Sequence, residues 1–420
     1  MRIIKNLMRS EFKFAAIFAV AIALAAGNSF AQTAAEMKSE HTVSFEPVLG
    51  LTYVEGRVNG SRPLHMVLDT GASDTVLKPE IAAELGLKHS GETVQAAGQG
   101  KGADETMRLV KGVTLEFAGQ KLTDQTIATL SVDYIDREAG QPTDGLLGGN
   151  IFVNFVVHED YAGHTVTLIR PEKFVAPKGF TAVPLTVAGT ASLLQLHLVG
   201  LGGEKIDGLF LLDSGQVGSV FFMSSFVDAH PGLKSGRLIA LPPVTAVGGD
   251  MQVSVGRLAS IGVGPFVVAG PPALYPSNSP GGLASTPIAG IVGAQVLGRF
   301  DVIFDYPHGM LWLKPNAEFG KPFFTNASGL QLEVEPPEFH RVKVRAVIAG
   351  SPAEQAGVMA GDIVVAMSNT PLEDAATAGS PQLTLAEISE WLRETERDVY
   401  LRIERAGRLL VLHFKTKQLV

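Results

Sequence analysis

The sequence contains no cysteine, which excludes disulfides and a lipid-anchored cysteine. Only 18% of residues are charged, and the net charge of −8 comes without any basic run, so the sequence lacks the electrostatic footprint of a nucleic-acid-binding protein. No Cys/His cluster has metal-ligand spacing, and no G-x-S-x-G motif marks a serine nucleophile. We therefore expect a function without cofactor, metal or nucleic acid, in a protein whose 46% apolar residues supply a large core.

Long apolar runs are also scarce, and one of them lies near the start of the chain. Four basic residues precede the apolar stretch Phe14–Ala26, and the small-x-small tripeptide Ser29-Phe30-Ala31 follows it. This order predicts a signal peptide over residues 1–31 and a periplasmic or secreted product, with no stable membrane span after cleavage. An uncleaved membrane anchor is the alternative, although the run is short for a spanning helix.

Two acidic tripeptides dominate the remaining sequence: Asp69-Thr70-Gly71 and Asp213-Ser214-Gly215. Each follows an apolar run, and each is followed after a long interval by an apolar segment that ends in glycine. These segments are Gly145-Leu146-Leu147-Gly148 and Gly290-Ile291-Val292-Gly293. The same order in both halves predicts that two similar units each present one carboxylate.

Other features repeat in the same order. A glycine-containing turn, Asn59-Gly60 or Gly202-Gly203, precedes each acidic tripeptide, and residues 155–161 share a Phe…Asp-Tyr pattern with residues 300–306. Alternating apolar and polar residues favour strands, with short helices near 79–85 and 224–229. The sequence therefore predicts a mainly β protein with two lobes, 41–172 and 173–318.

The paired carboxylates indicate acid–base chemistry. Two carboxyl groups within hydrogen-bonding distance share one proton, because like charges so close together cannot both ionise. The ionised partner can then take a proton from water while the protonated partner polarises a carbonyl. On this interpretation Asp69 and Asp213 are catalytic. Gly71 and Gly215 allow tight turns, and the hydroxyls of Thr70 and Ser214 hold the two loops together across the lobes.

The two tripeptides, each with its later apolar-apolar-Gly segment, resemble the aspartic peptidases of the pepsin and retroviral protease superfamily. The resemblance covers both lobes and implies a two-lobed pepsin-like or retropepsin-like β-barrel fold with a cleft for polypeptide substrates. It implies endopeptidase activity, and a flap for which Ala96–Ala103 is the candidate, with Gly98, Gly100 and Gly102.

Three positions depart from the pepsin-like pattern. No tyrosine lies between residues 91 and 110, where the flap tyrosine would stand, and Gln216 follows the second tripeptide. Ala72 stands where pepsin-like enzymes carry a hydroxyl. Fewer hydrogen bonds to the ionised pair would raise its pKa, so we expect activity nearer about pH 5 to 7 than strongly acidic pH.

The last part of the chain, residues 326–417, has a different motif. Ser351-Pro352-Ala353 with Gly357 and Gly361-Asp362 resembles the PDZ family, after a linker at 315–328. The resemblance implies a small α+β domain that adds a peptide as a strand, with a C-terminal or internal peptide as partner. Its peptide-binding residues would be Gly329, Leu330, Leu332, Leu385 and Ile388, with Gln331 departing from the usual glycine. Alternatively, this domain packs on the lobes and never binds a free ligand.

Two other functions remain open at this point. The lobes could be degenerate, which would leave a non-catalytic periplasmic peptide-binding or scaffold protein. A second alternative is a homodimeric peptidase that uses only Asp69, one from each copy.

Overall fold

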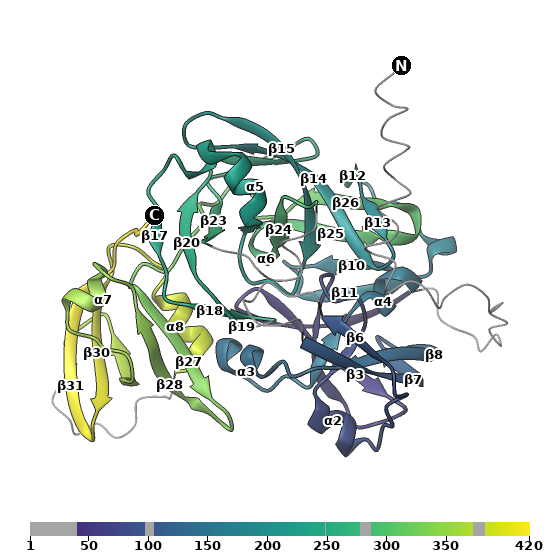
Figure 1. Ribbon diagram of the computed structural model, residues 1–420, viewed down its shortest axis with the longest axis horizontal. Coiled ribbons are helices and arrows are strands. Elements are labelled where there is room, and N and C mark those ends of the chain that lie inside the picture. The colour runs from purple at the N-terminus through teal and green to yellow at the C-terminus, as the bar shows by residue number, and fades with distance from the viewer. Residues whose placement is uncertain (1–39, 97–104, 248, 278–286, 373–382) are drawn as a thin grey trace. The chain divides into compact units, whose positions relative to one another are not determined.

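The computed structural model describes residues 40–96, 105–247, 249–277, 287–372 and 383–420 (Figure 1). Strands predominate in these residues and form five sheets, which confirms the predicted mainly β fold. The predicted lobe boundaries stay predictions. In the described part of the chain, no helix has the length and apolar character needed to cross a membrane.

The first lobe is built on an eight-stranded sheet with the order β2-β3-β4-β9-β5-β8-β7-β6. Its strands are β2 (Glu46–Val48), β3 (Leu51–Val58), β4 (Leu64–Leu68), β5 (Val76–Leu77), β6 (Thr93–Ala96), β7 (Glu105–Phe117), β8 (Gln120–Thr129) and β9 (Gly145–Leu147). Three helices accompany them: α2 (Pro79–Glu84), α3 (Asp133–Ala139) and α4 (Gly149–Asn154). The turn at Asn59-Gly60 has positive φ at both residues, and the Ser61 amide donates to the Val58 carbonyl across it at 3.0 Å. The paired residues of β3 and β4 end at Gly56 and Leu64, so this turn lies within a longer connection than the tight hairpin that the sequence predicts.

The second lobe has a larger sheet of ten strands, ordered β17-β20-β23-β16-β24-β15-β14-β21-β22 with β13 paired to β14. Its strands are β13 (Thr186–Ala188), β14 (Ala191–Val199), β15 (Lys205–Asp213), β16 (Val220–Phe222), β17 (Ile239–Ala240), β20 (Val253–Arg257), β21 (Ser260–Val263), β22 (Phe266–Ala269), β23 (Pro272–Pro276) and β24 (Gly290–Gly293). The helices are α5 (Ser224–Ala229) and α6 (Ala294–Leu297). A separate hairpin joins β18 (Val244–Ala246) to β19 (Gly249–Met251).

The two lobes repeat the same central arrangement. In the first, β4 runs parallel to β9 and β9 antiparallel to β5; in the second, β15 runs parallel to β24 and β24 antiparallel to β16. A Cβ atom added to Gly145 or Gly290 would lie 2.1 Å from a backbone oxygen, that of Val76 or Phe221 respectively. Both glycines are therefore required for close strand packing, and the predicted internal repeat is present in three dimensions.

A third sheet contains strands from both halves of the chain. Its order is β1-β11-β10-β25-β26-β12. The strands are β1 (Glu40–Ser44), β10 (Val156–Asp160), β11 (Thr165–Ile169), β12 (Thr181–Pro184), β25 (Phe300–Asp305) and β26 (Met310–Pro315). Strands β10 and β25, which carry the two copies of the repeated pattern, pair directly with Val157 opposite Phe304. Backbone hydrogen bonds therefore join the two halves beneath their individual sheets.

The C-terminal module contains a five-stranded sheet ordered β27-β28-β29-β30-β31. The strands are β27 (Leu330–Glu335), β28 (Glu338–Val347), β29 (Ile363–Ser368), β30 (Asp398–Arg405) and β31 (Arg408–Lys415), with helices α7 (Pro352–Gln355) and α8 (Leu385–Trp391). Thr384 and Glu387 form the predicted capping box at the start of α8. Leu385, Ile388 and Leu392 share one face of this helix and are buried in the module's core.

After Pro315, the last residue of β26, the predicted linker has no helix or strand, but it is held against the second lobe. Arg299 donates hydrogen bonds to the carbonyls of Glu318 (2.9 Å), Lys321 (2.5 Å) and Pro322 (3.3 Å), and its guanidinium lies over the ring of Phe323. Because one arginine binds several backbone carbonyls between residues 318 and 322, this segment is an ordered connection rather than a free spacer.

Candidate active site

The two predicted catalytic aspartates lie at equivalent ends of buried strands. Asp69 directly follows β4, and its backbone N–H donates to the Leu147 carbonyl of β9 at 2.9 Å. Asp213 is the last residue of β15 and pairs in register with Gly293 of β24. Asp69 is 8% exposed, whereas Asp213 keeps somewhat more solvent exposure. The backbone of each apolar-Gly segment therefore pairs with the backbone of the neighbouring aspartate and fixes its position, as the sequence predicts.

The hydroxyls of Thr70 and Ser214 form a reciprocal network between the lobes. The Ser214 amide donates to Thr70 Oγ1 at 2.9 Å, and the Thr70 amide donates to Ser214 Oγ at 3.1 Å. Each hydroxyl then donates to the opposite strand, Thr70 Oγ1 to the Leu212 carbonyl (3.1 Å) and Ser214 Oγ to the Leu68 carbonyl (3.0 Å). Both side chains are buried. Four buried hydrogen bonds therefore fix the spacing of the two acidic loops.

Replacing Thr70 by Val should reduce the free energy of unfolding by about 1 to 3 kcal/mol, because the Ser214 amide and the Leu212 carbonyl would lose a buried partner. Denaturant unfolding of the full chain measures this change. Thr42→Val is the matched control: its hydroxyl is hydrogen-bonded to Thr167 on the exposed surface, so the expected change is within about 0.5 kcal/mol. Equal losses in the two variants would contradict a structural role for the network.

The glycines of the two tripeptides bring the carboxylates face to face. A Cβ atom added to Gly71 would lie 2.5 Å from Asp213 Cγ, and one added to Gly215 would lie 2.5 Å from Asp69 Cγ. The Gly71 amide also donates to Asp69 Oδ1 at 2.8 Å. Each glycine therefore lies directly against the carboxylate of the opposite lobe, where no side chain would fit. Both aspartates of the predicted pair meet in one site of a single chain.

The surroundings keep a proton on this pair. Desolvation by the surrounding protein raises the pKa of Asp69, although the hydrogen bond from the Gly71 amide works in the opposite direction. Desolvation, then the negative charge and hydrogen bond of Asp69, raise the pKa of Asp213 well above its usual range. Two adjacent carboxyls whose ionised forms are both disfavoured share a proton over a broad pH range.

The loop after each tripeptide packs against the last glycine of its apolar segment, Gly148 in the first lobe and Gly293 in the second. A Cβ atom added to Gly148 would lie 2.7 Å from the Ala72 carbonyl oxygen, and one added to Gly293 would lie 2.6 Å from that of Gln216. Gln216, which departs from the family pattern, therefore takes the same backbone position as Ala72. A glutamine at this position therefore leaves the backbone of the second loop like that of the first.

Two tyrosines near the pair were not predicted from the sequence. Burial and then the charges of Asp69 and Asp213 raise the pKa of Tyr134, which lies on α3. The same charges add to the effect of burial in raising the pKa of Tyr306, whose hydroxyl donates to Ser192 Oγ at 2.6 Å. Both phenols therefore stay protonated, and Tyr134 packs on the same hydrophobic cluster as Ala72 of the first acidic loop.

The sequence contained a partial signal for one of them. The repeated Asp-Tyr pattern includes both Tyr161 and Tyr306, but of these two tyrosines the charges of Asp69 and Asp213 raise the pKa of Tyr306 only. Tyr161 instead lies beside Glu159 in a buried acidic contact. The repeat thus identified the strands but not the different roles of their tyrosines.

The other predicted site residues have different positions. Gly98, Gly100 and Gly102 lie outside the described residues; β6 and β7, which flank them, form an antiparallel hairpin with Ala96 opposite Glu105. In the C-terminal module, Leu330, Leu385 and Ile388 are buried in the core, and Leu332 packs against it. Gly329 has φ of 88° beside Ser351. Peptide binding by these residues stays a prediction.

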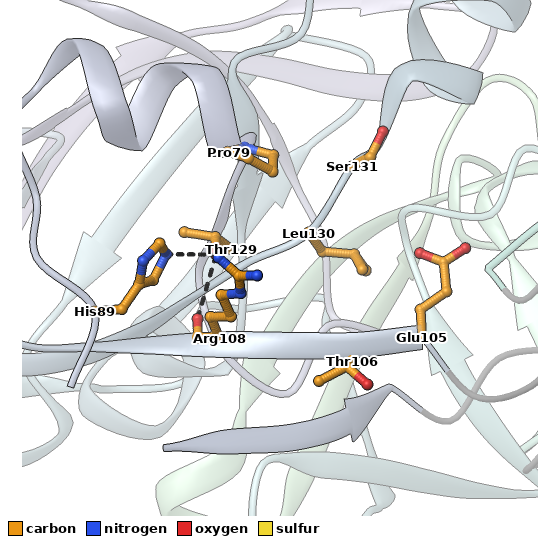
Figure 2. Close-up of a pocket in the computed structure, with 8 residues that line it drawn as sticks. All are labelled: Pro79, His89, Glu105, Thr106, Arg108, Thr129, Leu130 and Ser131. Carbon is orange, nitrogen blue, oxygen red and sulfur yellow. Dashed lines mark hydrogen bonds between the residues drawn. The ribbon is translucent and has the colours of Figure 1, made fainter. Parts of the chain in front are cut away.

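A separate cavity of about 450 Å³ lies beside the β6–β7 hairpin rather than at the aspartates (Figure 2). It is bounded by β7, the end of β8 and the start of α2, and His89 is hydrogen-bonded to Thr129 Oγ1 at 3.1 Å in its wall. The lining residues are Pro79, His89, Glu105, Thr106, Arg108, Thr129, Leu130 and Ser131. No group of side chains in the described residues has the composition of a metal site.

Comparison with known families agrees with this geometry. Residues 54–151 match the family model described as aspartyl protease, and residues 343–405 match the family model of the PDZ domain. The first match includes Asp69 and the Gly145–Gly148 segment, whereas Asp213 lies beyond it. A search of curated proteins gives no match.

Proposed function

Because the chain combines an aspartyl protease domain with a PDZ domain, we propose that it is an exported aspartic-type endopeptidase. The observation that carries this proposal is the reciprocal contact of each tripeptide glycine with the carboxylate of the other lobe. This arrangement puts two carboxyls with raised pKa values in one partly solvent-accessible site. The substrates would be extended or unfolded polypeptides bound between the lobes.

The proposed reaction needs only water and the two carboxyls. The ionised aspartate takes a proton from water, whose oxygen attacks the peptide carbonyl, while the protonated aspartate donates to the carbonyl oxygen. The tetrahedral intermediate, which carries two hydroxyls, then collapses: its nitrogen takes a proton from the protonated carboxyl, one hydroxyl gives its proton to the other carboxylate, and the carbon–nitrogen bond breaks. One carboxylic acid and one amine leave, and the pair again holds one proton.

Export is proposed from the sequence alone. The basic residues and apolar stretch within residues 1–31 support a signal peptide, and the cysteine-free composition suits a periplasmic protein that relies on its core for stability. N-terminal sequencing of the protein purified from the exported fraction tests this; a mature chain beginning at Gln32 is expected.

The two alternatives predict different behaviour. A homodimer that used only Asp69 would not require the Thr70–Ser214 network within one chain, and the observed network favours an intramolecular pair. A non-catalytic binding protein would bind peptides without cutting them. Its phenotype would be insensitive to changes at Asp69.

The direct test is to incubate the purified mature chain with a mixed peptide library and identify new termini by mass spectrometry. Cleavage that persists in the presence of a metal chelator and disappears in the Asp69→Asn/Asp213→Asn variant would support the proposal. No cleavage between pH 3 and 7, or equal cleavage by this variant, would contradict it.

We expect the pH–rate profile to peak at about pH 5 to 7, the range predicted from Ala72 in place of a hydroxyl. The raised pKa values of both carboxyls act in the same direction. The active form carries one proton on the pair. Acidification adds a second proton to the pair and so removes the carboxylate that acts as general base. Because the pKa of this carboxylate is raised, cleavage activity is lost at a higher pH than it would be with ordinary aspartates. Initial rates of one purified peptide across pH 3 to 8 measure the profile. A maximum below about pH 3 would be incompatible with the raised values.

A further inference from the structure

Helix α3 is anchored in the first lobe by a buried lysine. Lys78 Nζ lies 2.5 Å from Asp136 Oδ2 and 3.0 Å from Asp133 Oδ1. Asp136 Oδ1 also accepts the Thr143 amide at 3.0 Å, which ties the helix to the chain that follows it. The helix ends at Gly140, whose φ of 77° is the left-handed conformation typical of a glycine at a helix C-terminus.

The same helix also contacts the PDZ domain. It packs against β27, which is an edge strand of the five-stranded sheet, and α8 lies beside the same strand. A Cβ atom added to Gly140 would lie 2.7 Å from Leu385 Cβ at the start of α8. Arg345 Nη1 donates to Glu138 Oε1 at 3.4 Å. Helix α3 thus lies against the strand and the helix between which PDZ domains add a peptide strand.

The loop before β27 has its amides already occupied. The amides of Ser328 and Gly329 donate to Asn326 Oδ1 at 3.1 and 2.8 Å, and the Leu330 amide donates to Ser328 Oγ at 3.1 Å. A peptide carboxylate would need such N–H groups for its own binding. The surface is therefore better suited to a chain segment that lacks a free carboxylate.

The docked helix is connected to the catalytic cleft. Tyr134 of α3 packs on one hydrophobic cluster with Ala72 of the first acidic loop and Val217 beyond the second, and the charges of Asp69 and Asp213 add to burial in raising its pKa. Ala386 of α8 and Val247 of the second lobe pack on this same cluster.

Arg345 makes a further link from the PDZ domain to the second lobe. Its Nη2 donates to the Pro243 carbonyl, directly before β18, while its Nη1 contacts Glu138 in the first lobe. The PDZ domain therefore contacts both lobes through one arginine.

We propose that α3 is the resident ligand of the PDZ domain, and that this docking restrains the cleft in a low-activity state. An extended internal peptide segment can pair with β27 only by displacing α3. Displacement releases the links at Glu138 and Pro243 and lets the cluster beside the carboxylates rearrange for substrate. This inference rests on the proposed peptidase function for its effect on rate, whereas the docking itself does not.

A reversible cross-link tests the proposal in the full mature chain. Because the protein has no cysteine, Glu138→Cys/Arg345→Cys carries its only two thiols. A bifunctional thiosulfonate reagent, long enough to replace both side chains, would link α3 to β28, and dithiothreitol would remove the link. We expect efficient intramolecular cross-linking and a kcat/KM about tenfold lower in the linked form than after reduction.

The controls separate docking from catalysis. Each single-cysteine variant treated in the same way should show no change in rate after reduction. Hydrogen exchange across residues 69–76 and 133–140 should be slower in the linked form than in the reduced form, and this readout needs no peptidase activity. If no form cleaved any peptide while linking and exchange behaved as expected, the proposed function would fail but the docking would stand.

A second variant avoids introduced thiols. Ala386→Glu places a charge at the half-buried contact of α8 with the hydrophobic cluster, and it should raise kcat/KM about tenfold with faster exchange in α3. Val411→Glu adds the same charge at an exposed position of β31, the opposite edge strand, and should change neither. Failure to form the cross-link, equal rates of linked and reduced forms, or identical behaviour of these two variants would overturn the proposal.

Discussion

Replacing either carboxyl with an amide, in Asp69→Asn or Asp213→Asn, is expected to lower kcat for peptide cleavage by about 10³-fold or more. The reaction needs one ionised and one protonated carboxyl, and an amide can neither take a proton from water nor return one to the leaving nitrogen. The two variants should therefore lose activity to a similar extent.

These variants should keep their fold. Burial disfavours the charged form of both aspartates, so a neutral amide of the same shape fits the site without added electrostatic cost. Thermal unfolding should show a midpoint no lower than that of the parent. Asp124→Asn, at an exposed position of β8, is the control and should retain full activity. Loss of activity in Asp69→Asn alone would indicate a pair formed by two copies of the first lobe.

The second large effect is expected from Gly71→Ala. The added methyl group would lie 2.5 Å from Asp213 Cγ, which is far inside van der Waals contact, so the opposite carboxylate must move. Since proton transfer requires hydrogen-bonding distance, we expect kcat to fall about 100-fold or more. Gly71 does not have positive φ, so the loss cannot come from backbone strain. Gly215→Ala should give the same result from the other side.

The matched control for this substitution is Gly320→Ala. Gly320 has no positive φ, and an added Cβ atom would meet nothing within 4 Å. Its activity and stability should therefore be close to those of the parent. A Gly71→Ala enzyme with more than half of the parent kcat would show that the two carboxylates are farther apart in solution than the structure indicates.

Local sequence patterns predicted much of this fold. Asn59-Gly60 gave the hairpin before the first aspartate, and the glycine-ended segments gave the strands β9 and β24 behind the two acidic loops. These signals are strong because each requires a particular residue type: positive φ in the turn, or no side chain against a neighbouring backbone. The same requirement made Asp69 and Asp213 recognisable as a pair.

Contacts between distant parts of the chain could not be predicted in this way. Nothing in the helix Asp133–Ala139 indicates that Tyr134 lies near the carboxylates or that Glu138 meets Arg345. Such contacts depend on how whole units pack, and an ordinary tyrosine or glutamate in a short helix suits many surroundings. The hydrogen bonds that fix the linker could not be predicted for the same reason, because Arg299, which donates them, lies outside the linker.

The sheet shared by the two halves has a consequence for where such a protein can work. The lobes belong to one polypeptide, and backbone hydrogen bonds between β10 and β25 hold them together, so the two aspartates meet at an effective concentration that the chain itself sets. An active site built from two separate copies depends on how often those copies encounter each other. Released into a dilute compartment, a chain of this kind carries its complete catalytic pair as a single molecule.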